Sequence, residues 1–162
     1  MIIHVKNKNT LIIDDFKLKC CIGKKNFNAN KKEGDYSTPK GLFDIKKLYF
    51  RKDRVGHPIC KIKSKVIKKN RVWCDDPNHK QYNKEIFSSN RGHKESLYRK
   101  DHNYDYLITI SHNIKRVPYE GSAIFIHLTD NYKPTAGCIA LKKKDFQILL
   151  KLIDKKTKIK IG

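Results

Sequence analysis

Short apolar runs separated by polar turns fill the first part of the chain, and this pattern is typical of β-strands. Residues 2–5 and 11–13 flank a Lys-Asn-Lys-Asn connection and predict a hairpin. Residues 16–22 alternate apolar side chains with lysines, as a strand with one buried face does. Residues 42–50 and 59–67 repeat the strand pattern. The first part of the chain is therefore expected to be all β.

The C-terminal part combines two apolar strands, a helix and a last strand. Residues 104–111 and 122–128 are strand-like, and the second run is almost entirely apolar, which favours a central position in a sheet. Residues 143–153 predict the one good helix, because apolar side chains recur on one face at spacings of three and four. Residues 157–161 close the chain as a strand. With no repeat or linker in sight, we expect one mainly β domain over residues 1–162.

The middle of the chain, residues 68–101, is the least regular segment. A loop of this length is unusual in a compact domain unless it serves the function. We expect a long loop region there, with a short helical piece at residues 94–99.

Charge suggests a polyanionic partner, but the composition weakens that interpretation. The chain holds 37 Lys and Arg against 16 Asp and Glu, a net charge of +21. Only 6 of the basic residues are Arg, the residue that binds phosphate with two parallel hydrogen bonds. The 31 lysines are spread along the chain, and Lys, Ile and Asn are all encoded by A/T-rich codons. Either base composition or an anionic polymer explains the charge, and no specific nucleic-acid partner is expected.

Membrane-spanning, disulfide-bonded and metal-binding classes are all disfavoured. No apolar run approaches the roughly 18 residues that span a bilayer, and the first residues read as a strand rather than as a signal peptide. The five cysteines are odd in number, and they have no spacing to histidine typical of a zinc site. We therefore expect no metal and no membrane span.

One segment places a base and a nucleophile within reach of each other. His127 lies near the end of a buried strand, and Cys138 follows a turn of small residues. A thiol nucleophile needs an imidazole to take its proton and backbone N–H groups to hold an oxyanion. Gly137 permits a sharp turn, so the amides of Gly137 and Cys138 are candidate oxyanion donors. Spacing alone, however, favours a structural cysteine and a structural histidine.

The motif around this pair resembles the catalytic motif of the YkuD-type L,D-transpeptidases, a histidine on a strand followed by Ser/Thr-x-Gly-Cys. The resemblance covers most of the chain and indicates a compact, stand-alone bacterial branch. The matching segments, in chain order, are Gly34-Asp35-x-x-Thr38-Pro39-x-Gly41-x-Phe43, Arg51-x-Asp53-Arg54, Trp73-Cys74-Asp75-Asp76-Pro77, Glu95-x-Leu97-Tyr98-Arg99-x-Asp101, Tyr104-Asp105, His112-Asn113, Gly121-Ser122-Ala123-Ile124-Phe125-x-His127 and Thr135-x-Gly137-Cys138.

Two positions depart from the family pattern. Many members carry His between the Ser/Thr and the Gly, where this chain has Ala136, and many carry Arg two residues after the Cys, where it has Ala140. The role of that arginine is then absent or moved to another arginine, for which the candidates are Arg51, Arg54 and Arg99.

The resemblance implies an L,D-transpeptidase-type β-barrel or sandwich that needs no cofactor. Cys138 is implied to be the nucleophile and His127 the base, acting on peptidoglycan stem peptides, with a crosslink from L-alanine to diaminopimelate as one option. We expect a monomer. Such a function belongs in the periplasm or cell wall, which conflicts with the lack of a visible signal peptide. An L,D-carboxypeptidase or amidase on the same scaffold, and a non-catalytic basic binding module, remain as alternatives.

Other conspicuous side chains are candidates for substrate binding. Trp73 either packs in the core or lines the cleft, and Asp75 and Asp76 either bind a substrate amine or cap a turn. His112 ends the strand before the His127 strand and is a candidate second histidine of the site. The remaining candidates for substrate contact are Thr135 and Arg54.

Overall fold

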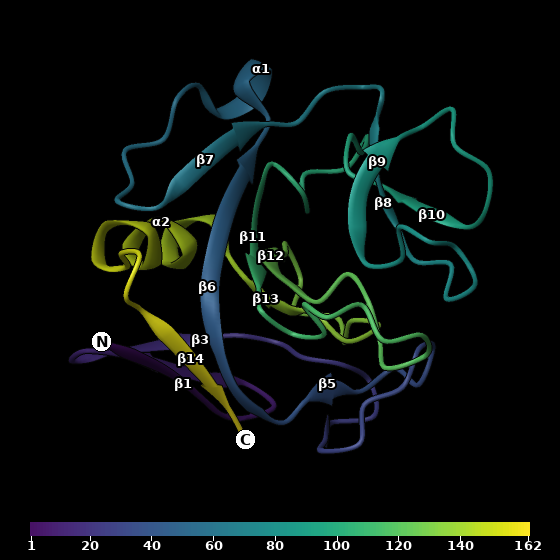
Figure 1. The fold of residues 1–162 in the computed structure, drawn as a ribbon. Helices are drawn as coiled ribbons and strands as arrows, with labels where there is room; N and C mark the ends of the chain where they lie inside the picture. The colour runs from purple at the N-terminus through teal and green to yellow at the C-terminus, as the bar shows by residue number, and fades with distance from the viewer.

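A sheet of nine strands forms the body of the protein in this computed structural model, which describes all 162 residues (Figure 1). Its strands are β1 (Ile2–Asn7), β2 (Thr10–Ile13), β3 (Phe16–Lys19), β6 (Gly41–Phe50), β7 (Lys63–Val66), β11 (Tyr106–Ile110), β12 (Phe125–Leu128), β13 (Ile139–Leu141) and β14 (Lys158–Ile161). Eight of them follow the order β13-β12-β11-β6-β14-β1-β2-β3, and β7 adds to β6. The first and last strands, β1 and β14, pair in parallel, so the N-terminus and the C-terminus lie at opposite ends of this strand pair (Figure 1).

The two ends of this sheet meet and nearly close it into a barrel. Cys21, just beyond β3, forms an antiparallel bridge to Ala140 of β13, and each residue donates its N–H to the other's carbonyl at 2.9 Å. The expected mainly β fold of barrel or sandwich type is confirmed. Closure removes the exposed sheet edges that would otherwise pair with other chains.

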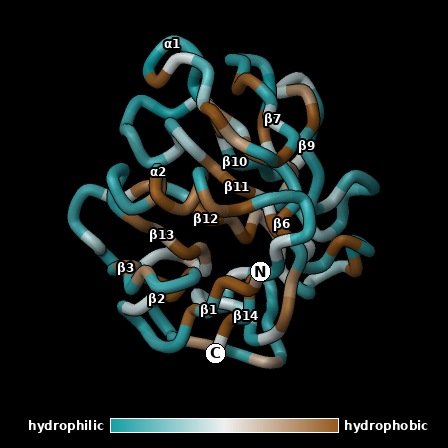
Figure 2. Tube along the Cα trace, turned by 90° about the vertical axis from the view of Figure 1, so that its left-hand side faces the viewer, coloured by the Kyte–Doolittle hydropathy of each residue, from teal (hydrophilic) through white to brown (hydrophobic).

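The core fills the inside of this sheet and is closed by α2 (Lys143–Leu152). The predicted helix is present, and Phe146, Leu149 and Leu150 of its apolar face are buried. The ring of Phe146 stacks on Tyr106 of β11, with 5.5 Å between ring centroids. Burying such side chains contributes about 1.5–3 kcal/mol each. Figure 2 shows the apolar positions gathered along the strands and on α2.

The expected strand over residues 122–128 is shorter, because only Phe125–Leu128 forms β12. Ala123 has a φ of 52°, which an extended strand does not allow. The run is nevertheless buried throughout, so the apolar pattern reported burial correctly. In the same way, only Lys63–Val66 of the expected strand over residues 59–67 is extended.

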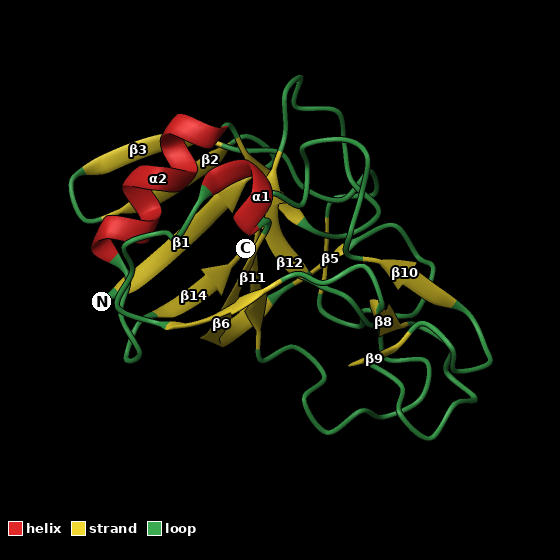
Figure 3. Ribbon diagram, turned by 90° about the horizontal axis from the view of Figure 1, so that it is seen from above, coloured by secondary structure: helices red, strands yellow, loops and turns green.

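Most of the middle segment, residues 68–101, lies outside strands and helices, as expected, but the prediction missed three short strands. The segment contains a three-stranded sheet made of β8 (Arg71–Cys74), β9 (Lys84–Phe87) and β10 (Lys94–Ser96), in the order β10-β8-β9. The expected helical piece at residues 94–99 is wrong, since β10 pairs antiparallel with β8. Val72, Cys74 and Ile86 form a small core for this sheet. It stands to one side of the main sheet, opposite α2 (Figure 3).

Three short elements complete the chain. They are α1 (Lys52–Val55), which follows β6, and the pair β4 (Phe27–Asn28) and β5 (Thr38–Pro39). No helix of the protein is long and apolar enough to cross a membrane.

Candidate active site

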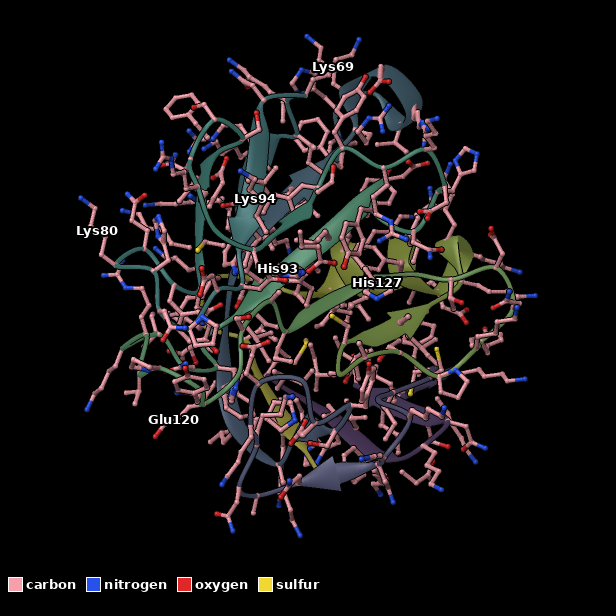
Figure 4. The ribbon with its side chains drawn as sticks, turned by 90° about the vertical axis from the view of Figure 1, so that its right-hand side faces the viewer. Lys69, Lys80, His93, Lys94, Glu120 and His127 are labelled. Atoms are coloured by element: carbon pink, nitrogen blue, oxygen red, sulfur yellow. The ribbon has the colours of Figure 1, made fainter.

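A cavity of about 660 Å³ has both His127 and Cys138 in its wall. The backbone register explains why the two residues meet. β12 and β13 pair in parallel with His127 opposite Ala140, so Cys138 lies two residues before the partner of His127. The small middle sheet contributes Glu95 to this cavity, and the segment between β4 and β5 contributes Lys31. Figure 4 looks onto this face, with His93 and His127 near its centre.

Hydrogen bonds of Thr135 fix the turn that carries Cys138. Its hydroxyl accepts the N–H of Gly137 at 3.1 Å and donates to the carbonyl of Cys138 at 2.6 Å. Gly137 has a φ of 150°, and a Cβ there would come within 2.8 Å of the carbonyl oxygen of Ser37. Only glycine therefore fits beside the nucleophile. The Thr135 side chain lies in the cavity wall, but its hydrogen bonds serve the turn.

The turn of residues 34–41 contacts the turn that carries Cys138. Thr38 is fully buried; its hydroxyl donates to the carbonyl of Gly137 at 2.8 Å and accepts the N–H of Gly23 at 2.8 Å. Asp35 holds the turn itself by accepting from the N–H and hydroxyl of Ser37 and from Lys31 Nζ. Burial opposes ionisation of Asp35, but these donors prevail and keep its pKa well below the usual range. The turn of residues 34–41 thus supports the turn that carries Cys138.

The thiol of Cys138 is protonated at rest. Its Sγ donates to the carbonyl of Ala123 at 3.1 Å and accepts the N–H of Phe125 at 3.4 Å. Burial, together with the nearby charge of Glu95, raises the pKa of the Cys138 thiol to about 12. An imidazolium beside the thiol would depress this pKa, but here burial dominates and raises it. To act as a nucleophile, this thiol would need a base that takes its proton.

His127 has the protonation state of such a base. Its Nδ1 lies 2.7 Å from the carbonyl oxygen of Leu128. A carbonyl oxygen only accepts, so Nδ1 carries the proton and Nε2 keeps a lone pair. Burial lowers the pKa of His127 to about 4, which leaves the ring neutral near pH 7. The edge-on ring of Tyr104, with centroids 5.1 Å apart, fixes the plane of the imidazole. No hydrogen bond joins His127 to Cys138 at rest.

Comparison with known families decides which family this chain belongs to. The model of the YkuD family, described as the L,D-transpeptidase catalytic domain, matches residues 2–161. The chain belongs to the YkuD family of L,D-transpeptidase catalytic domains. Among solved structures, this YkuD domain is similar to the helical cell shape determining protein Pgp2 from Campylobacter jejuni, with a TM-score of 0.51 and 16% identity. The match covers 99% of this chain and 46% of Pgp2, so the chain spans less than half of that protein's length. A search of curated protein sequences finds no match.

One of the two expected oxyanion donors of the YkuD domain is already occupied. The N–H of Gly137 donates to Thr135, whereas the N–H of Cys138 makes no hydrogen bond within the protein. The Cys138 amide is therefore the free donor beside the thiol. The N–H of Gly137 already has a partner at rest, and the position also has the conformational role described above.

Several expected substrate contacts lie outside the cavity wall. Arg54 donates to the carbonyls of Lys100 and Asp101 and pairs with Asp105 at 2.9 Å, so its guanidinium holds a loop. Trp73 packs edge-on against Phe125 and does not line the cavity.

Two more of these residues also have structural partners. His112 lies against Phe43 and contacts the carbonyl of Glu120, and Asp76 accepts the N–H of Asn78 as a turn cap. The positions of these residues follow from long-range packing, which spacing in the sequence does not encode. Asp75, in contrast, does line the cavity, where it pairs with His93 at 2.6 Å.

Acidic side chains gather in this cavity despite the net charge of +21. Five carboxylates line it, against two lysines and one arginine; they are Glu33, Asp75, Glu95, Asp101 and Asp130. Arg99 is that arginine, and of the three candidates to replace the missing family arginine it alone reaches the cavity. It pairs with Asp101 at 2.6 Å and lies over the ring of Tyr104.

Sequence reasoning did not single out Glu95 and Tyr104 as site residues, although both lie in quoted motif segments. The carboxylate of Glu95 accepts a hydrogen bond from the hydroxyl of Tyr104. The signal in the sequence that could have identified Glu95 and Tyr104 was their position, as polar side chains, within these motif segments. No group of three or more His, Cys, Asp or Glu side chains is placed to hold a metal ion.

Proposed function

We propose that this protein is a cysteine-dependent L,D-transpeptidase that joins peptidoglycan stem peptides through a thioester on Cys138, without a cofactor. One observation carries the proposal: a protonated thiol and a neutral imidazole share the wall of a single cavity. Base and nucleophile are then each in the state that the first step requires. The whole chain, residues 1–162, acts as the catalytic domain.

In the first half-reaction, Nε2 of His127 takes the proton of Cys138 as Sγ attacks the carbonyl carbon that follows an L-centre of the donor stem. The free N–H of Cys138 donates to the developing oxyanion. When the C–N bond breaks, the imidazolium gives its proton to the departing amine, which leaves as a D-amino acid or a peptide that begins with one. The enzyme is left as a thioester with a neutral His127.

In the second half-reaction, an amine of a second stem attacks the thioester and restores the thiol. We assign the side-chain amine of diaminopimelate to this role, and the L-alanine to diaminopimelate crosslink as the product type. The resemblance of the segment from Trp73 to Pro77 to a compact branch supports this product. Water in place of the amine would make the same enzyme a carboxypeptidase.

Incubation with purified stem peptides tests the proposal. We expect an acyl adduct in the intact mass of the protein, and crosslinked peptide when an acceptor stem is added. Hydrolysed donor as the sole product, with and without acceptor, would replace the transpeptidase with a carboxypeptidase. Specific nucleic-acid binding with no adduct would favour the non-catalytic module.

A further inference from the structure

Three carboxylates of the cavity have no cationic partner, and two of these three are partly buried. Asp101 is neutralised by Arg99, Asp75 is paired with His93, and Asp130 is exposed at the rim. Glu33 and Glu95 make no ion pair, and each accepts one hydrogen bond from a tyrosine hydroxyl. An unpaired carboxylate within a cavity is costly unless a positive ligand meets it there. The site therefore has room for a cation.

Glu95 differs from Glu33 in its relation to the reacting groups. The tyrosine bound to Glu95, Tyr104, places its ring against the imidazole of His127. Glu95 thus belongs to a connected set that runs from carboxylate to phenol to imidazole, all in the cavity wall. Only one of its carboxylate oxygens is occupied by Tyr104, and no protein group hydrogen-bonds to the other. That oxygen is available to a ligand.

In the second half-reaction the acceptor ammonium loses two protons, and His127 accounts for only one of them. The acceptor is an amine with a pKa near that of lysine, about 10.4, so it arrives as an ammonium. Forming an amide removes two of its protons. One of them returns to Cys138 through His127 as the C–S bond breaks. The other has to leave before attack, because an ammonium has no lone pair.

We propose that Glu95 binds the incoming ammonium of the acceptor and takes its first proton. The freed lone pair forms the C–N bond to the thioester carbon, His127 takes the second proton and passes it to Sγ as the C–S bond breaks, and Glu95 releases its proton to water. The products are the amide and the free thiol. This inference rests on the proposed function and deepens it, by naming the residue that selects a charged amine over water.

The environment suits Glu95 to this exchange. Burial, with some help from Asp75 and Glu33, raises its pKa, so its carboxylate is a stronger base than an ordinary one. The hydroxyl of Tyr104 opposes this rise by donating to the carboxylate and keeps it oriented.

The test separates the two half-reactions by the decay of a preformed acyl-enzyme, followed by intact mass. In Glu95→Gln we expect the preformed acyl-enzyme to undergo aminolysis by a stem-peptide amine at least about 100-fold more slowly than in the wild type, in the range of lost general-base catalysis. Hydroxylamine is uncharged at neutral pH and needs no first deprotonation, so both proteins should react with it at similar rates. Glu95→Asp keeps the base and should restore part of the aminolysis.

Glu33→Gln is the matched control, because it removes one carboxylate with a tyrosine partner from the same cavity. An equal loss of aminolysis in Glu33→Gln would mean that the negative charge of the cavity, and not Glu95 itself, causes the effect, and would overturn the proposal. Equal slowing with hydroxylamine, unchanged aminolysis, or a failure of Glu95→Gln to acylate would each overturn it as well. Absence of any acyl-enzyme in the wild type would instead overturn the proposed function itself.

Discussion

The ionisation states of two buried side chains decide what chemistry this cavity supports. Burial keeps His127 neutral and Cys138 protonated, and the hydrogen bond from Nδ1 to Leu128 leaves Nε2 as the proton acceptor. A thiolate that forms only during attack stays unreactive toward other electrophiles between turnovers. In the proposed mechanism, the thiol therefore becomes reactive only when substrate is bound.

Acylation should retain its full rate far below the pKa of an ordinary histidine. The pKa of His127 is about 4, so the neutral base persists until the pH falls through that value, and the rate should drop only there. Single-turnover acylation measured from pH 8 to pH 4 checks this. His127→Ala should be slower by about 100-fold or more across the range. Half-loss of the wild-type rate near pH 6.5 would contradict the account.

The same residue should make stability depend on pH. The unfolded chain protonates His127 below about pH 6.5, whereas the folded protein does so only below about 4, so the unfolded state binds the extra proton in between. The free energy of unfolding should then fall as the pH drops from 7 to 4, by about 3 kcal/mol from this residue.

Urea unfolding of His127→Gln at both pH values measures that contribution. The variant should lose less stability between pH 7 and pH 4 than the wild type. His4→Gln, which changes a histidine outside the cavity, serves as the control. Identical pH dependence in the wild type and His127→Gln would show that burial does not shift this pKa.

Among the elements, the strands with clear alternation or apolar runs were predictable and the small middle sheet was not. Strands at residues 2–5, 11–13 and 42–50, and the helix, lie where the pattern placed them. β8, β9 and β10 are strands of three or four residues whose pairing joins segments far apart in the sequence. Local pattern carries no information on such pairing. For the same reason Glu95, which β10 delivers to the cavity, escaped notice.

The contact between the turn of residues 34–41 and the turn that carries Cys138 should be essential for activity. Thr38→Val leaves the N–H of Gly23 and the carbonyl of Gly137 without their partner, which costs about 1–3 kcal/mol of stability. Acylation should fall at least about 10-fold in addition, because Cys138 loses its support. Single-turnover acylation and urea unfolding report the two effects.

Thr157→Val is the matched control for that change. Its buried hydroxyl bonds only to Asp154, near the last strand, so stability should drop while acylation stays the same. Equal acylation rates in the two variants would mean that the turn of residues 34–41 does not position the nucleophile.

Across the whole molecule basic residues predominate, whereas acidic residues predominate in the cavity wall. The chain carries +21, yet carboxylates outnumber lysine and arginine around Cys138. We expect the surface lysines to adsorb the enzyme to an anionic wall polymer, while the cavity selects a positively charged amine. These two roles respond differently to salt, because exposed charges are screened beyond about 8 Å at physiological ionic strength.

Raising the salt concentration should therefore release the protein from the wall without stopping the chemistry. Co-sedimentation with purified peptidoglycan should weaken several-fold when the NaCl concentration is raised about tenfold, from roughly 50 to roughly 500 mM, because binding to a polyanion releases counterions. Turnover of a small soluble stem peptide should change by less than about twofold. Sequence-selective DNA binding that survives high salt would contradict this division.

The most direct test of the central claim is to locate the acyl group. After incubation with a donor stem peptide, peptide mapping of the wild type should place the adduct on Cys138. Cys138→Ala should form no adduct while keeping the fold, and Cys60→Ala should be acylated like the wild type. An adduct on another residue, or turnover by Cys138→Ala, would contradict the account.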